Sequence, residues 1–131
     1  MDCITWIYPK RYSHHFIKIL EDLYENYSIY RTVVVCRNKY YMERLYFELL
    51  SYGISVIRLQ SFWDLEHFHE SNHRVMIITF DQIYQYPDLI KEYAFGQDYL
   101  WILHEMSSLQ EQYCISHMRE VNNINYYVYI N

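Results

Sequence analysis

The stretch Thr32–Leu59, TVVVCRNKYYMERLYFELLSYGISVIRL, contains a complete strand–helix–strand pattern. It opens with the uninterrupted apolar run Thr32–Cys36, which is typical of a strand buried on both faces of a parallel sheet. Apolar residues then recur every three or four positions over Met42–Leu50, which predicts a helix, and Gly53 follows as a C-terminal cap. The run Ser55–Leu59 predicts the next strand. This segment indicates an α/β protein.

The same alternation extends to both ends of the chain. Further strands are expected at Cys3–Tyr8, Val75–Thr79, Tyr99–Leu103 and Asn125–Ile130. Helices are expected over Phe16–Tyr27, Asp88–Phe95 and Ser107–Glu120, and Phe62–Glu70 fits a helix or a loop, with Ser61 and Asp64 spaced for N-terminal capping. We therefore expect a single α/β domain over residues 1–131, with three αβα layers and a mainly parallel sheet of five or six strands.

Composition limits the functional classes. The 131 residues are 52% hydrophobic and 21% charged, and 11 Lys and Arg stand against 16 Asp and Glu, for a net charge of -5. This balance supports a globular core and argues against coating of nucleic acid by the whole surface. Cys3, Cys36 and Cys114 have no CxxC spacing, which favours free thiols in a reducing compartment. No apolar run approaches a membrane span or a secretory signal, so we expect a cytoplasmic protein without membrane contact.

The order of elements, with these local sequences, resembles the first RecA-like domain of superfamily-two helicases. Thr32–Leu59 resembles the strand–helix–strand that follows the nucleotide loop of that family. Arg74–Tyr84 (RVMIITFDQIY) resembles the next strand and helix, Tyr99–Leu109 (YLWILHEMSSL) takes the place of the DEAH-type strand, and Asn125–Asn131 takes the place of the last strand. The resemblance implies a RecA-like sheet and a nucleic-acid contact by Arg37, Asn38, Lys39, Tyr40 and Thr79.

The chain departs from that family where nucleotide chemistry is concerned. The family binds the triphosphate with the motif GxxxxGK followed by Ser or Thr, whereas the corresponding turn here, Tyr8–His15, contains no glycine. His104 replaces the magnesium-coordinating Asp, ahead of Glu105, and imidazole is a poor ligand for this hard ion. We therefore expect no NTP hydrolysis and no cofactor. The polar residues at the strand ends either line a residual pocket or merely cap the next helix: Lys10, Arg11, Asp81, His104 and Glu105.

Tyrosine is the most unusual feature of the composition, with 17 residues. Exposed tyrosines are enriched at protein interfaces, and an acidic, tyrosine-rich chain fits a protein partner or a second copy of itself better than nucleic acid. The Tyr- and Ile-rich composition is also similar to that of small proteins of viruses that infect thermophilic archaea. The leading hypothesis is a non-enzymatic viral or accessory protein that binds another protein.

Two alternatives stay open at this stage. His67-Phe68-His69 matches the His-hydrophobe-His pattern of rolling-circle nickases, in which two histidines bind a metal and a tyrosine, here Tyr113 or else Tyr84, attacks the DNA phosphate. His69 and His73 are also spaced to share a metal on one helix face, although surface histidines of no function have the same spacing. The second alternative is a weak nucleic-acid-binding adaptor that uses the loop Arg37–Tyr41.

Overall fold

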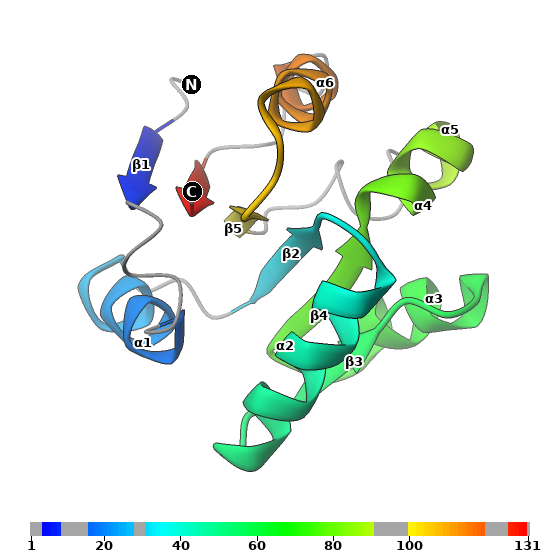
Figure 1. The fold of residues 1–131 in the computed structure, drawn as a ribbon. Helices are drawn as coiled ribbons and strands as arrows, with labels where there is room; N and C mark the ends of the chain where they lie inside the picture. The colour runs from blue at the N-terminus through cyan, green and yellow to red at the C-terminus, as the bar shows by residue number, and fades with distance from the viewer. Residues whose placement is uncertain (1–3, 9–15, 28–30, 91–99, 120–125, 131) are drawn as a thin grey trace.

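One parallel sheet organises the computed structural model, which describes residues 4–8, 16–27, 31–90, 100–119 and 126–130. Within these residues the sheet has six strands in the order β1-β6-β5-β2-β4-β3 (Figure 1). Every neighbouring pair is parallel. The strands are β1 (Ile4–Tyr8), β2 (Thr32–Cys36), β3 (Val56–Arg58), β4 (Val75–Thr79), β5 (Leu100–His104) and β6 (Tyr126–Ile130).

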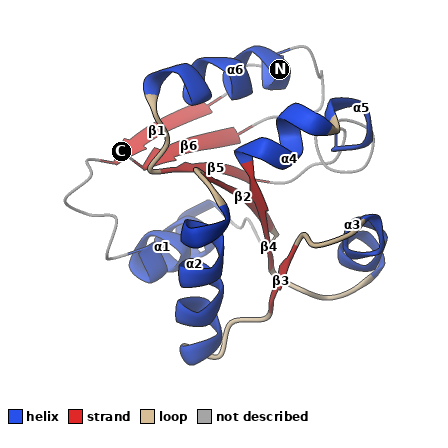
Figure 2. Ribbon diagram, turned by 45° about the vertical axis from the view of Figure 1, so that its right-hand side comes forward, coloured by secondary structure: helices blue, strands red, loops and turns tan. Residues whose placement is uncertain are grey.

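Helices cover both faces of this sheet (Figure 2). They are α1 (Phe16–Tyr27), α2 (Lys39–Ser51), α3 (Phe62–Glu70), α4 (Phe80–Gln85), α5 (Pro87–Ile90) and α6 (Ser108–Arg119). The buried clusters show that α1 and α2 pack on one face, whereas α3, α4 and α6 pack on the other. The predicted three-layer αβα architecture with a parallel sheet is confirmed. None of the helices in the described ranges is long and apolar enough to cross a membrane.

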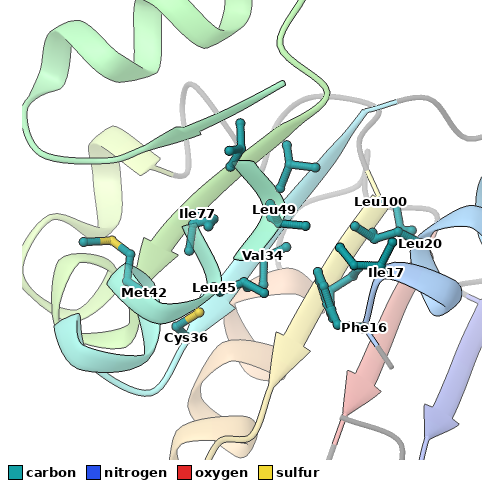
Figure 3. Close-up of a cluster of buried hydrophobic side chains, with 13 residues drawn as sticks. Phe16, Ile17, Leu20, Val34, Cys36, Met42, Leu45, Leu49, Ile77 and Leu100 are labelled. Carbon is teal, nitrogen blue, oxygen red and sulfur yellow. The ribbon is translucent and has the colours of Figure 1, made fainter. Parts of the chain in front are cut away.

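Alternation along β2 explains why its whole sequence is apolar. Val33 and Val35 belong to the core on the α3, α4 and α6 side, whereas Val34 and Cys36 belong to the core under α1 and α2. Figure 3 shows Val34 and Cys36 beneath Leu45 of α2. A central strand of a covered parallel sheet must be apolar on both sides, because both faces lose contact with water.

Local sequence signals set the two ends of α2. Asn38 is the N-cap, and its Oδ1 accepts a hydrogen bond from the backbone N–H of Tyr41 at 3.1 Å. At the other end Gly53 has a φ of 75°, its N–H donates to Leu50, and the N–H of Ile54 donates to the carbonyl of Leu49. These two bonds form a Schellman motif, so the cap predicted at Gly53 is confirmed.

Several predicted boundaries are corrected by the structure. The ambiguous segment Phe62–Glu70 is a helix, with Asp64 accepting from the N–H of Ser61 at 2.8 Å. In the segment Asp88–Phe95, expected to be helical, α5 begins at Pro87 and is described as far as Ile90; residues 91–95 lie outside the described residues. The helix α4 follows Thr79 directly, as the resemblance of Arg74–Tyr84 to a strand and helix of the helicase family implied. β5 ends one residue later than expected, so His104 belongs to the strand.

Candidate functional site

The carboxyl ends of β2, β4 and β5 lie side by side at the centre of the sheet. Cys36 is the register partner of Thr79 in β4 and of His104 in β5. We call this row and the neighbouring end of β3, together with the loops and first helical turns that follow these strands, the carboxyl edge. Ligands of open α/β sheets bind at this end of the strands. The structure therefore brings together three strand ends that the sequence places far apart.

Two glutamines tie the carboxyl edge together. Gln82 forms a capping box with Thr79, and its Nε2 also donates to the carbonyl of Leu59 at 2.6 Å. Gln110 forms the same kind of box with Ser107, and its Nε2 reaches the carbonyl of Arg37 at 3.4 Å. Each glutamine therefore caps its own helix and holds the neighbouring loop. Thr79 and Asn38, both expected to contact nucleic acid, have their side-chain oxygens engaged in capping.

His104 is the most unusual residue of the carboxyl edge. Only 7% of its surface is exposed, and neither ring nitrogen has a hydrogen-bond partner among the described residues. Its ring meets the ring of Phe16 edge-on, with centroids 5.1 Å apart. Burial lowers the pKa of His104 to about 4, with Arg44 acting in the same direction and Glu105 in the opposite one. The imidazole is therefore neutral at physiological pH.

Glu105 occupies the residue position directly after His104. Its φ of 51° is left-handed, which is uncommon for a residue other than glycine. Its Oε2 lies 3.9 Å from Nδ1 of His104. Of the other predicted strand-end residues, Asp81 is exposed in the first turn of α4, and Lys10 and Arg11 lie outside the described residues. A neutral imidazole beside one carboxylate offers magnesium fewer oxygen ligands than a pair of carboxylates does.

The segment Arg37–Tyr41, expected to be a loop, forms one corner of the carboxyl edge, and its last three residues are the first turn of α2. The Arg37 guanidinium lies 5.4 Å from the centre of the Tyr41 ring, and its buried Nε has no hydrogen-bond partner among the described residues. Lys39 is exposed, and Tyr40, 66% exposed, meets Tyr41 edge-on with centroids 5.6 Å apart. Two cations beside an exposed aromatic ring can contact a phosphate backbone and stack on a base.

Large exposed apolar side chains surround the same edge. Tyr40, Trp63 and Leu109 are each the second residue of a helix that starts there, α2, α3 and α6 respectively. Trp63 is 78% exposed and Leu109 is 79% exposed. Next to Trp63, a pocket of about 240 Å³ is lined by Leu59, Gln60, Ser61, Gln82 and Tyr86. Exposed aromatic side chains beside a concave surface are typical of protein interfaces.

The residues expected for a nickase are not brought together. His67 lies on helix α3, and the side chain of His69 lies outside the described residues. His73 contacts Ser55, just before β3, whereas the Tyr113 ring contacts Phe80, just after β4. The histidine and the tyrosine therefore lie at opposite ends of a five-residue strand, which is roughly 16 Å long. The structure therefore does not bring Tyr113 to the described histidines His67 and His73.

Two features of the site had not been anticipated. The glutamine ties could have been found, because Thr79-Phe80-Asp81-Gln82 and Ser107-Ser108-Leu109-Gln110 both match the capping-box pattern. The aromatic cluster of Phe80, Tyr84, Tyr113 and His117, with ring centroids 4.3 to 6.2 Å apart, joins α4 to α6 and has no signal in the linear sequence.

The fold is that of a RecA-like α/β domain, as it occurs in solved helicase structures. Three solved structures show the likeness. The Hef helicase domain of Pyrococcus furiosus matches with a TM-score of 0.66 at 12% identity, over 89% of this chain and 24% of that one. The C-terminal part of the Fun30 ATPase domain matches with a TM-score of 0.61 at 11% identity, over 88% of this chain and 40% of that one. The structure of the E. coli DEAD-box protein SrmB bound to RraA matches with a TM-score of 0.64 at 14% identity, over 98% of this chain and 77% of that one.

These likenesses concern the fold. The chain spans about a quarter of the matched Hef chain and two fifths of the Fun30 chain. Because the Fun30 structure is described as a C-terminal part, the likeness is not confined to a first helicase domain. No protein-family model matches the sequence, and no curated protein does.

Proposed function

We propose that this chain is a non-catalytic binding module, of viral or accessory origin, built on a helicase-type domain that has lost nucleotide binding. Its leading partner is another protein or a second copy of the chain. His104 carries the proposal. At the position expected to hold a magnesium-binding Asp there is a buried imidazole, packed on Phe16 and neutral at physiological pH. The glycine-free turn Tyr8–His15 supports the same conclusion from the sequence.

Surface chemistry favours a protein partner over nucleic acid. In the described loops and first turns of the carboxyl edge, the acidic side chains of Asp64, Asp81, Glu105 and Glu111 outnumber the basic side chains of Arg37 and Lys39. Phosphates are repelled by such an edge. Exposed tryptophan, tyrosine and leucine side chains instead supply the apolar area that a protein interface buries.

Sedimentation velocity over a range of concentrations tests the protein interface. We expect the wild-type chain to form a concentration-dependent dimer, and we expect the double variant Trp63→Ser with Leu109→Ser to stay monomeric. Tyr52→Ser is the matched control, because Tyr52 is 66% exposed at the far end of α2. A double variant that associates as well as the wild-type chain would contradict an interface at the carboxyl edge.

A second candidate function is weak binding of single-stranded nucleic acid by the loop Arg37–Tyr41. The arrangement of Arg37, Lys39 and exposed Tyr40 favours it. A mobility-shift assay at low salt separates the candidates. If the chain stays monomeric but shifts an oligonucleotide, and Arg37→Glu with Lys39→Glu abolishes the shift, the adaptor function replaces the protein interface.

A further inference from the structure

Two histidines face each other at the amino end of the sheet, away from the carboxyl edge. His67 belongs to the last turns of α3, and His73 lies in the segment between α3 and β4. Their Nε2 atoms are 3.3 Å apart, and their ring centroids are 5.2 Å apart with the planes inclined at 59°. The two Nε2 atoms are therefore in direct contact, at a distance long for a hydrogen bond between them.

This separation matches a shared metal ion. Two imidazole nitrogens bound to Zn²⁺ at about 2.0–2.1 Å with tetrahedral angles lie about 3.3–3.4 Å apart. A direct hydrogen bond between the rings would more often be near 2.9–3.0 Å, as protein hydrogen bonds with N–H donors are. The distance between the Nε2 atoms of His67 and His73 is thus the one that two ligands of one tetrahedral ion adopt.

The surroundings of His73 prepare its Nε2 for binding. The Nδ1 atom lies 2.8 Å from Oγ of Ser55, and when Nδ1–H donates to this hydroxyl the lone pair is left on Nε2. Metal-bound histidines commonly have such an outer hydrogen bond.

Arg31 fixes the backbone on both sides of the histidine pair. Its Nε donates to the carbonyl of His73 at 3.2 Å, and its Nη2 donates to the carbonyl of Phe68, the neighbour of His67. The guanidinium also lies 4.2 Å from the centre of the Phe68 ring. One side chain thus holds the end of α3 against the segment before β4. A site held in place in this way loses little entropy when it binds an ion.

We propose that His67 and His73 bind one divalent transition-metal ion of the Zn²⁺ class through their Nε2 atoms, with Ser55 as the outer hydrogen-bond partner of His73. Imidazole ligands select Zn²⁺, Cu²⁺ or Ni²⁺ over Mg²⁺ and Ca²⁺, which prefer oxygen. No cluster of three or more His, Cys, Asp or Glu side chains is found among the described residues, so water completes the coordination. The bound ion links α3 to the segment that enters β4.

Isothermal titration of the full chain with ZnCl₂ alone tests the site. We expect saturable binding by the wild-type chain, at least tenfold weaker binding by His67→Gln and by His73→Gln, and about tenfold weaker binding by Ser55→Ala. His117→Gln is the matched control, because His117 is also a partly exposed ring whose Nδ1 contacts a neighbouring group, the carbonyl of Tyr113. Its affinity should equal that of the wild-type chain.

Circular dichroism without zinc shows whether each variant is folded. If a histidine variant fails to fold, NMR of the histidine ring nitrogens in the wild-type chain tests the site. Zinc should shift the Nε2 resonances of His67 and His73 together. The proposal is overturned if the wild-type chain binds no zinc. It is equally overturned if the folded His67→Gln and His73→Gln variants bind as the wild-type chain does, or if zinc leaves both Nε2 resonances in place.

Discussion

Lowering the pH from 7 to 5 should reduce the free energy of unfolding by about 2 kcal/mol through the protonation of His104 alone. The buried ring has its pKa lowered to about 4, mainly by loss of water, while an unfolded histidine titrates near 6.5. Between these two values the unfolded chain holds one more proton than the folded chain. The free energy of unfolding is therefore fully retained above pH 6.5 and falls as the pH drops toward 4.

The size of the effect follows from the two pKa values. The difference of 6.5 minus 4, which is 2.5 units, corresponds to about 3 kcal/mol once both states are protonated. At pH 5 about 2 kcal/mol of this is already lost, because the unfolded histidine is almost fully charged there while the folded one is mostly neutral. Glu105 opposes the shift, so Glu105→Gln should lower the pKa of His104 further and enlarge the loss.

Urea unfolding at pH 7 and pH 5, followed by tryptophan fluorescence, measures this contribution. Between the two pH values, the free energy of unfolding of His104→Leu should fall by about 2 kcal/mol less than that of the wild-type chain. At pH 7 the variant should be at least as stable as the wild-type chain, because it removes two buried nitrogens without described partners. His73→Gln controls for the other histidine with a lowered pKa. If the wild-type chain and His104→Leu lost equal stability, the neutral, buried His104 would be refuted.

Three further predictions concern stability, all measured by urea unfolding at pH 7. Gln82→Ala should lower the free energy of unfolding by about 1–2 kcal/mol, because the carbonyl of Leu59 and the backbone N–H of Thr79 both lose a hydrogen bond; an unchanged midpoint would show that the glutamine tie is not formed. Gly53→Ala should lower the free energy of unfolding by about 1 kcal/mol because of the φ of 75° alone, since a Cβ at this position meets no atom within 4 Å. An unchanged free energy of unfolding would contradict the left-handed cap. Leu49→Ala should cost about 2–5 kcal/mol in the core, whereas the neighbouring change Leu50→Ala, at a side chain 43% exposed, should stay within about 0.5 kcal/mol; equal costs would contradict the packing of α2.

The strands could be predicted because burial on both faces leaves a strong signal. Thr32–Cys36 and Val75–Thr79 were expected with the boundaries that the structure has, and both have buried side chains throughout. His104 was placed after its strand because it is polar. In the structure His104 is the last residue of the strand, because the register pairs it with Cys36 on one side and Ile130 on the other.

The site was less predictable, because it depends on contacts between distant segments. The short helix α4 has six residues, which are too few to show an apolar period. Its signals in the sequence are the capping box and the resemblance of Arg74–Tyr84 to a helicase strand and helix. Helical spacing suggested that His69 and His73 share a face. Because α3 ends at Glu70, His73 lies beyond the helix, and its ring contacts that of His67, whereas the side chain of His69 lies outside the described residues.

Titration of the full chain with ATP in the presence of MgCl₂ is the most direct measurement of the central claim, that this domain has the helicase fold without its nucleotide chemistry. We predict no saturable heat of binding at ATP concentrations that saturate a nucleotide-binding helicase domain, and no release of phosphate. Saturable ATP binding that EDTA abolishes would contradict the claim.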